Sequence, residues 1–464
     1  MLVLVLALAG GVAATYRYDL ADRWFPREAE GPVDPATVAP PPGLDLPPVT
    51  EPAAVAAAAT AAPLDPAAVE AVLAPYLANR DLGRHVLAGV TGLAGGPSYS
   101  FGAGTAIPAS TTKLLTGTAA LATIDPATTF ATRVVRSGSR VTLVGGGDPL
   151  LAGAPAEADE SVRPVRADVT TLARQAASAL LADGVTRVRL RYDDTLFAGP
   201  AVNPHWPASY LPDGVVAPIS ALWVDEGRPA SGSGRVADPA RAAADVFARE
   251  LAAAGVQVAG APAPKAAPAG ATAVTEVRSA PLAQLVEHAL LVSDNEATEV
   301  LLRQVALAAG AEGSAAAGVR TVLGTLAGLG VPTDQVRMWD GSGLSRENRI
   351  PPATLLEVLR VAATGAPALR TVVEALPVAG FTGSLSERFV DAPAEGRGRV
   401  RAKTGTLTGV SSLAGVATTV EGTPLVFVLM SDKVKEADTL DARDALDDAA
   451  AALAACTCAG TVVP

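Results

Sequence analysis

Histidine, cysteine and aromatic residues are scarce in this chain. Its 464 residues include three His and two Cys, and aromatic residues make up 4%. The two cysteines, Cys456 and Cys458, lie together near the C-terminus. This leaves little material for a protein-ligated zinc site or for Cys/His catalysis, so we predict no metal. An enzyme of this composition works mainly with hydroxyls, amines and carboxylates.

Basic residues are also in deficit. The chain has 36 Lys and Arg against 47 Asp and Glu, which gives a formal net charge of -11. Proteins that bind nucleic acids usually carry an excess of basic residues for the phosphates. This chain has an excess of acidic residues, so we expect no nucleic-acid partner. Hydrophobic residues make up 49% of the chain and still build a sizeable core. The length predicts two domains plus accessory segments.

The N-terminal region contains a short apolar stretch over residues 2–14. It is long enough for a signal-peptide core but shorter than the roughly 20 residues that a membrane-spanning helix requires. We expect 1–30 to be a signal segment or an anchor that associates the chain with a membrane. An ordinary apolar terminus is the alternative, because no Lys or Arg precedes the stretch, although a start codon placed too far downstream would explain that. A Pro/Ala-rich linker follows over 31–64.

The remaining chain predicts mixed α and β structure. A helix should open at Asp65-Pro66, an N-cap and first-turn pair. Apolar spacing predicts further helices over 111–122, 169–183, 238–254, 281–291, 294–309, 351–363 and 442–455. Strand-like runs cover 133–135, 140–144, 188–192, 410–418 and 425–430, the last two joined as a hairpin. This content indicates an α+β or α/β class.

Two of the five lysines stand in candidate catalytic motifs. Ser110 and Lys113 are three residues apart at the start of an apolar helix, so the amine can reach the hydroxyl. A serine becomes a good nucleophile only when an adjacent base takes its proton, and a desolvated lysine can serve as that base. Read alone, the pair also fits a serine N-cap followed by a surface lysine.

Two further motifs follow. Ser293-Asp294-Asn295 stands between two apolar helical stretches and alone predicts a helix start with a capping serine. Lys403-Thr404-Gly405-Thr406 follows a strand-like run, where the glycine lets a ligand approach and the lysine and hydroxyls suit a carboxylate. A polar edge strand is the alternative. The three motifs occur in the order seen in penicillin-binding proteins and class A β-lactamases.

Beyond these motifs, the chain resembles the class C low-molecular-mass penicillin-binding proteins, the D-alanyl-D-alanine carboxypeptidase/endopeptidase family, over nearly everything from Asp65 to Cys458. Additional similar segments are Leu143–Leu150, Tyr192–Phe197, Pro218–Asp225, Asp340–Arg346 and Gly383–Arg388. The resemblance implies an α+β fold, a penicillin-binding/β-lactamase-like catalytic domain whose antiparallel sheet is flanked by helices. An α/β domain would be inserted between the first and second motifs.

The implied domains follow from the motif positions. The catalytic domain would comprise 65–123 and 277–458, and the inserted domain 124–276. A further inserted domain, which some members carry, would be reduced or absent. Gly145-Gly146-Gly147 would form a structural turn and not a phosphate cradle, because no P-loop Lys or Ser/Thr follows it.

The resemblance also implies a mechanism. Ser110 would attack the carbonyl between the last two D-alanines of a peptidoglycan stem peptide, with Lys113 as its base. Ser293 and Lys403 would relay a proton to the leaving amine, and Lys403 would lower the proton affinity of Lys113 by like-charge repulsion.

The remaining implied roles concern substrate binding. Asn295 would hold the substrate amide, while Thr404, Gly405 and Thr406 would complete the binding site, with the N–H groups of Ser110 and Thr406 forming the oxyanion hole. β-Lactams would inhibit by acylating Ser110, and no cofactor would be required. The implied location is the cell envelope, outside the cytoplasm.

Several alternatives stay open at this point. A serine β-lactamase would share the acylation chemistry, and a catalytically silent wall protein could keep the fold. The sequence does not decide between carboxypeptidase and endopeptidase action. Cys456 and Cys458 could form a disulfide, remain free thiols or bind a metal. The three histidines have no partners at ligand spacing, which is typical of packed or surface imidazoles.

Overall fold

A five-stranded antiparallel sheet forms the centre of the catalytic part. The computed structural model describes residues 63–156, 163–458 and 460. Within them the sheet has the order β2-β1-β11-β10-β9. Its strands are β1 (His85–Gly92), β2 (Ser98–Phe101), β9 (Val400–Leu407), β10 (Val410–Thr418) and β11 (Pro424–Asp432). β9 is therefore an edge strand, and the hairpin predicted between β10 and β11 is confirmed.

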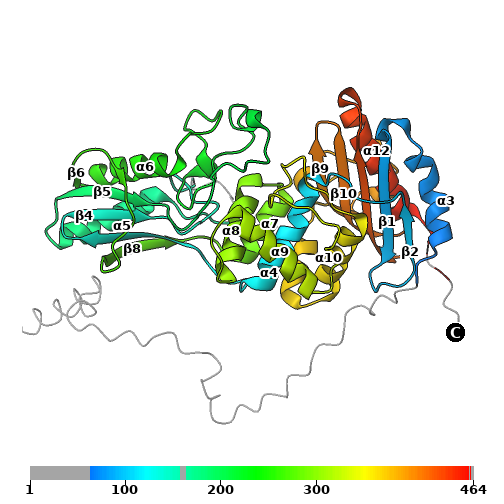
Figure 1. The fold of residues 1–464 in the computed structure, drawn as a ribbon, viewed down its shortest axis with the longest axis horizontal. Coiled ribbons are helices and arrows are strands. Elements are labelled where there is room, and N and C mark those ends of the chain that lie inside the picture. The colour runs from blue at the N-terminus through cyan, green and yellow to red at the C-terminus, as the bar shows by residue number, and fades with distance from the viewer. Residues whose placement is uncertain (1–62, 157–162, 459, 461–464) are drawn as a thin grey trace, which may run out of the picture. The chain divides into compact units, whose positions relative to one another are not determined.

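Helices cover both faces of this sheet, as β11 shows. Val426, Val428 and Met430 belong to one hydrophobic cluster, while the alternate residues Phe427 and Leu429 belong to another. Such a strand is buried on both faces. The second cluster includes α3 (Pro66–Leu77) and α12 (Thr439–Ala455), which lie beside the sheet in Figure 1. The first includes α4 (Lys113–Thr123), α7 (Leu282–Leu291), α8 (Asn295–Ala308), α9 (Ala315–Gly328), α10 (Pro352–Thr364) and α11 (Arg370–Glu374).

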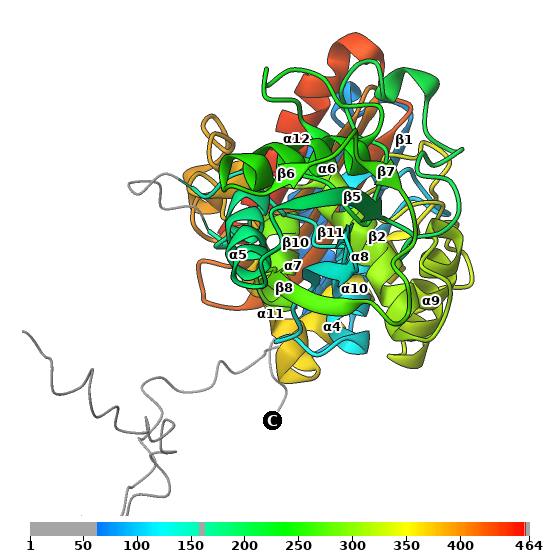
Figure 2. The ribbon, with the colours of Figure 1, turned by 90° about the vertical axis from the view of Figure 1, so that its left-hand side faces the viewer.

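A second sheet is built by the chain between Ser110 and Ser293. Its order is β6-β5-β4-β3-β8, with β7 paired to β5. The strands are β3 (Ala131–Ser137), β4 (Arg140–Val144), β5 (Arg187–Asp193), β6 (Gln257–Val258), β7 (Ala263–Pro264) and β8 (Thr272–Arg278). Helices α5 (Val169–Ala182) and α6 (Pro239–Ala253) pack on it through their own hydrophobic cluster (Figure 2). β4 and β5 are parallel and α5 connects them, so this unit has α/β character.

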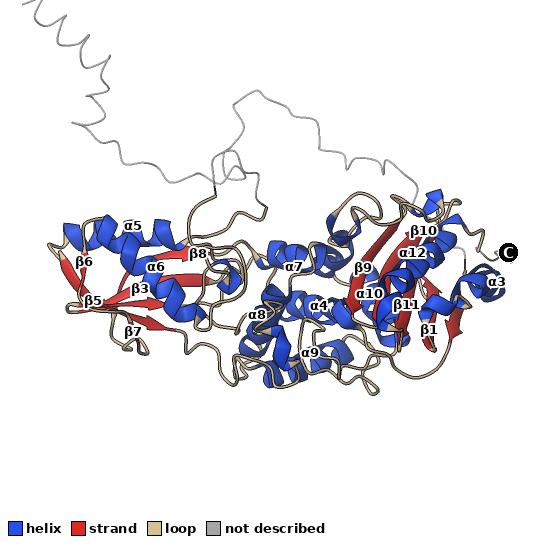
Figure 3. Ribbon diagram, turned by 90° about the horizontal axis from the view of Figure 1, so that it is seen from above, coloured by secondary structure: helices blue, strands red, loops and turns tan. Residues whose placement is uncertain are grey.

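Two of the three glycines at the end of β4, Gly145 and Gly146, pack against backbone. A Cβ on Gly145 would lie 2.4 Å from the Ala221 carbonyl oxygen, and one on Gly146 would lie 2.0 Å from the Ala131 carbonyl oxygen. These close approaches agree with the predicted structural turn. In Figures 1 and 3, helices α4, α7, α8 and α9 lie between the two sheets.

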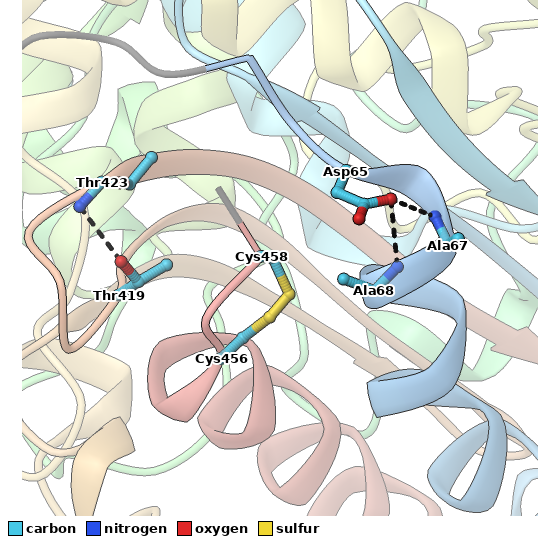
Figure 4. The surroundings of a disulfide bond; sticks show 7 residues. All are labelled: Asp65, Ala67, Ala68, Thr419, Thr423, Cys456 and Cys458. Carbon is cyan, nitrogen blue, oxygen red and sulfur yellow. Dashed lines mark hydrogen bonds between the residues drawn. A yellow bond between two sulfur atoms is a disulfide. The ribbon is translucent and has the colours of Figure 1, made fainter. Parts of the chain in front are cut away.

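The first and last described helices, α3 and α12, pack against each other. Asp65 caps α3 as predicted, accepting hydrogen bonds from the N–H groups of Ala67 and Ala68. Cys456 and Cys458 form a disulfide just after α12 (Figure 4). The Cys458 carbonyl accepts from the Asp65 N–H. Of the alternatives open for these cysteines, the structure therefore has the disulfide.

The mixed α+β fold with an antiparallel sheet flanked by helices is confirmed. No helix within 63–156 or 163–458 combines the length and the apolarity needed to span a bilayer. The signal or anchor segment predicted over 1–30, and all but the last two residues of the linker predicted over 31–64, fall outside the described residues. The domain boundaries at 124 and 276 stay predictions.

Candidate active site

Ser110 lies in a tight turn directly before α4. The turn is a short 3-10 segment over Ala109–Thr112, and Ala109 has a φ of 47°. A left-handed backbone at a residue other than glycine is strained, and such strain is typical of functional sites. The loop beside it packs closely, because a Cβ on Gly343 would lie 1.8 Å from the Ala109 carbonyl oxygen. The surrounding structure therefore holds Ser110 in one position just before the N-terminus of α4.

Lys113 is almost completely buried beside Ser110. Its exposed fraction is 1%, and its Nζ lies 3.0 Å from Ser110 Oγ. Nζ also donates to Asn295 Oδ1 at 2.7 Å and to the Ser342 carbonyl oxygen at 2.8 Å. A neutral amine has two hydrogens and one lone pair. The two carbonyl-type oxygens can only accept, so they take the hydrogens and leave the lone pair for the Ser110 hydroxyl.

Burial makes the neutral form of Lys113 accessible near neutral pH. Burial lowers the pKa of Lys113 from its ordinary value of 10.5 to about 8, although the negative charges of Asp294, Asp340, Glu299 and Glu296 act in the opposite direction. About a tenth of the lysine is then neutral at pH 7. The site thus supplies a base near neutral pH that an exposed lysine could not supply.

Lys403 stands on β9 with no exposed surface. Its Nζ donates to the Thr404 carbonyl oxygen at 3.0 Å. Burial, together with repulsion from Lys113 and Arg388, holds the pKa of Lys403 well below that of an ordinary lysine. Like-charge repulsion between the two lysines therefore contributes at Lys403, and the expected effect of Lys403 on Lys113 stays a prediction.

The Ser293-Asp294-Asn295 segment forms the turn between α7 and α8. Asp294 caps α8 through the Ala297 N–H, so the prediction of a capping serine is wrong. Ser293 precedes the cap with a φ of 64°, at a position after a helix end where glycine is usual. Its hydroxyl has no hydrogen-bond partner within the described part of the chain. This half-buried hydroxyl is available to a bound substrate.

The β9 edge brings the third motif against Ser110. A Cβ on Gly405 would lie 3.1 Å from the Ser110 nitrogen and 2.6 Å from the Pro108 carbonyl oxygen. Thr404 is buried and its hydroxyl lies 2.9 Å from that of Ser384, whereas Thr406 is exposed. The structure therefore brings Ser110, Lys113, Asn295 and Gly405 together directly, places Lys403 near Lys113, and leaves Thr406 facing outward.

The sequence analysis did not identify the residues that position the loop in contact with Lys113. Glu299 is fully buried, and its Oε1 accepts from the backbone N–H groups of both Gly341 and Ser342 at 2.8 Å. Asp340 fixes the same loop by accepting from the Gly343 N–H at 3.1 Å. These bonds orient the Ser342 carbonyl toward Lys113. Glu299 lies one helical turn after Asn295, and that spacing was the available signal.

The wild-type protein is expected to acylate slowly in acid. Only the neutral form of Lys113 can accept the Ser110 proton, and its pKa of about 8 lies above physiological pH. The acylation rate should fall about tenfold per pH unit below that value and level off above it. Rapid-mixing kinetics with a chromogenic β-lactam between pH 6 and 9.5 would measure this. A rate that is flat between pH 6 and 8 would contradict the assignment.

A Glu299→Gln variant is expected to shift that acid limb to lower pH. The amide oxygen can still accept both loop N–H groups, but the negative charge that raises the pKa of Lys113 is gone. The limb should move while the rate at its plateau changes little. Glu287→Gln, an exposed position on α7, is the control and should leave the profile unchanged. A shift to higher pH would disprove the charge effect.

Comparison with known proteins identifies extensive similarity. The model of the D-Ala-D-Ala carboxypeptidase 3 (S13) family matches residues 70–232 and 227–453. The chain is 37% identical over 435 residues to carboxypeptidase Rv3627c of Mycobacterium tuberculosis, covering 90% of each chain. It is 36% identical to carboxypeptidase DacB of Mycolicibacterium smegmatis, covering 83% of this chain and 84% of that one.

A solved structure agrees in fold. The crystal structure of penicillin binding protein 4 from Haemophilus influenzae superposes with a TM-score of 0.66 and 20% identity. The superposition covers 82% of this chain and 98% of that protein. At this level of identity the likeness shows a shared fold and nothing about the roles of individual residues.

Proposed function

This chain belongs to the D-Ala-D-Ala carboxypeptidase 3 (S13) family, and from that premise we propose that Ser110 is the residue acylated during its reaction. The protein is a serine D,D-peptidase that acts on peptidoglycan stem peptides, a class C low-molecular-mass penicillin-binding protein. One observation carries the assignment of Ser110. The buried Nζ of Lys113 lies 3.0 Å from the Ser110 hydroxyl. The two hydrogens of the neutral amine are donated to Asn295 Oδ1 and the Ser342 carbonyl oxygen.

Acylation begins with proton transfer from Ser110 to Lys113. Ser110 Oγ attacks the carbonyl carbon between the two terminal D-alanines, and its proton passes to the lone pair of Lys113 Nζ. The lysine becomes an ammonium whose three hydrogens have acceptors in its surroundings. The N–H groups of Ser110 and Thr406 stabilise the negative oxygen of the tetrahedral intermediate. The close contact of Gly405 with the Ser110 turn supports this placement.

Collapse of the intermediate releases D-alanine. The C–N bond breaks, and the proton that Lys113 took from Ser110 passes through Lys403 and Ser293 to the leaving nitrogen, which returns Lys113 to its neutral form. The free hydroxyl of Ser293 and the lowered pKa of Lys403 support this relay. Asn295 holds the substrate amide, and Thr404, Gly405 and Thr406 bind the terminal carboxylate end. Water then hydrolyses the ester on Ser110 and restores the enzyme.

β-Lactams are inhibitors of this chemistry because they offer a strained amide beside a carboxylate. They would leave a slowly hydrolysed ester on Ser110. The substrate lies outside the cytoplasm, so we place the protein in the cell envelope as an exported protein. Attachment to the membrane through residues 1–30 belongs to the same proposal.

Digestion of purified muropeptides tests the reaction. The wild-type protein should shorten pentapeptide monomers by one alanine, which mass spectrometry would detect. Splitting of cross-linked dimers into monomers would mark endopeptidase action by the same serine. Unchanged monomers and dimers would contradict a D,D-peptidase.

A serine β-lactamase would use the same acylation and differ in the second step. A chromogenic cephalosporin should give a burst of about one equivalent per protein, followed by slow turnover. Rapid steady hydrolysis without a burst would favour the β-lactamase.

A further inference from the structure

The second sheet carries its two helices, α5 and α6, on one face. Val188 and Leu190 of β5, and Val141 and Leu143 of β4, belong to the hydrophobic cluster that includes these helices. Side chains alternate along a strand, so the residues between them point to the opposite face. We call four side chains on that opposite face the arginine face: Arg140, Arg187, Arg189 and Arg191.

The arginine face has no matching carboxylates in the described part of the chain. None of its four guanidinium groups forms an ion pair or a hydrogen bond there. The carboxylates on the same side of the sheet are engaged elsewhere, because Glu276 pairs with Arg133 and Asp193 accepts from the Ala267 N–H. Three of the four side chains are exposed, and that of Arg191 is half-buried. These positive charges therefore face water in a chain whose formal net charge is -11.

The spacing of these arginines is unfavourable without an anion. Arg140 is the cross-strand neighbour of Arg189, and neighbouring strands lie about 4.8 Å apart. Arg187, Arg189 and Arg191 occupy every second position of β5, about 6.6 Å from one to the next. Like charges placed side by side on a sheet destabilise it. A bound carboxylate removes this repulsion, because a guanidinium donates two parallel hydrogen bonds to it.

The same side of the sheet leads into a cavity at the catalytic part. This cavity has a volume of about 590 Å³. Arg133, Val144 and Asp193 line it from β3, β4 and β5, and Gln304 and Leu307 close it from α8. The three strand residues lie on the side of the arginine face, since their neighbours along each strand belong to the hydrophobic cluster. Threonine hydroxyls and apolar side chains complete the lining, so a ligand on the arginine face can extend into a neutral cavity.

We propose that the arginine face and this cavity form a second peptidoglycan-binding surface, which holds the carboxylates of stem peptides away from Ser110. The proposal rests on the proposed function, because a D,D-peptidase acts on a polymer whose free stem peptides each end in a carboxylate. Removal of a terminal D-alanine leaves a new carboxylate at the end of the peptide, so the surface binds substrate and product alike.

The polymer also fits the arrangement of the surface. It presents many peptides, so weak contacts at several arginines add up to a useful affinity. The sugar rings between the peptides have hydroxyls and apolar faces, which suit the lining of the cavity. The surface keeps the enzyme on the cell wall between turnovers.

The experiment is a pelleting assay with the full chain and insoluble purified peptidoglycan from which hydrofluoric acid has removed attached phosphate polymers. The wild type should pellet with it, and the combined β5 variant, Arg187→Gln, Arg189→Gln and Arg191→Gln, should bind at least about tenfold more weakly. The matched control makes the same change of charge at three exposed arginines on helices and should bind as the wild type does: Arg174→Gln, Arg320→Gln and Arg370→Gln.

A second arm needs no variant. Amidation of the peptidoglycan carboxyl groups should weaken binding of the wild type as much as the β5 substitutions do, and added salt should weaken its binding to untreated peptidoglycan. Undiminished binding to the amidated polymer, or equal binding by the β5 variant, would overturn the proposal. Binding that disappears with the phosphate polymers, or capture by phosphatidylglycerol vesicles without capture by peptidoglycan, would assign the surface to another ligand and overturn it as well.

Acylation of the same samples separates this proposal from the proposed function. Fluorescent penicillin should label the β5 variant at the wild-type rate, since the drug reacts at Ser110 and carries no polymer to the arginine face. Joint loss of labelling and binding in the β5 variant would overturn a separate surface. A wild type that binds peptidoglycan through these arginines but is never acylated would refute the proposed reaction and leave the surface standing.

Discussion

A Lys113→Met variant should lose at least about a thousandfold in the rate at which penicillin acylates Ser110. Methionine has nearly the length of lysine and fits a buried position, so the fold should survive. It has no basic nitrogen, and Ser110 then has no partner for its proton. The two acceptors that hold Nζ, Asn295 Oδ1 and the Ser342 carbonyl oxygen, also lose their hydrogen bonds. Labelling with a fluorescent penicillin at several times would measure the rate.

A Lys113→Arg variant separates the role of base from that of a positive charge. Arginine keeps the charge but does not lose its proton in proteins, so it should be as inactive as methionine. Lys435→Met is the control, because that lysine is 86% exposed and far from the motifs in sequence. An active Lys113→Arg variant would show that Lys113 acts as a cation and that another group takes the proton.

Some helices could be predicted from the sequence and others could not. The helix predicted over 169–183 is found as α5 at Val169–Ala182, because an aspartate cap and a regular apolar face point to it. Helix α9 at Ala315–Gly328 was not predicted, because it contains several glycines, which weaken a helix on its own. A Cβ on Gly318 would lie 2.4 Å from the Leu302 carbonyl oxygen, so this glycine lets α9 approach α8 closely. Helix α9 therefore depends on its packing against α8 more than on the helix propensity of its own residues.

The candidate site shows the same limit. Ser110 lies in the turn that leads into α4 and Lys113 is the first residue of that helix, and their spacing of three residues alone predicts that they meet. The contact of Lys113 with the Ser342 carbonyl uses a backbone atom that any residue would offer, so no side-chain pattern encodes it. Ser293 was expected to cap α8, and its neighbour Asp294 does so instead. A motif thus predicts which segments come together in the site. Which atom of each segment makes the contact depends on the folded structure.

Gly405→Ala should lower the acylation rate by at least about a hundredfold while the protein stays folded. The added Cβ would lie 2.6 Å from the Pro108 carbonyl oxygen and 3.1 Å from the Ser110 nitrogen. Both are backbone atoms of the strained turn that holds Ser110, so they can yield only if the nucleophile moves. The Cβ would also lie 2.2 Å from Ser412 Oγ, which donates to the same Pro108 carbonyl.

Two companion variants locate the cause of this loss. Ser412→Ala combined with Gly405→Ala removes the shortest contact but keeps those with the backbone, so it should restore little of the rate. Gly324→Ala, in α9 where a Cβ meets nothing within 4 Å, should acylate normally and be slightly more stable. Stopped-flow acylation and Tm are the measurements. Full recovery in the double variant would place the clash on the Ser412 side chain, and a normal rate in Gly405→Ala would mean that the turn can shift without cost to the oxyanion hole.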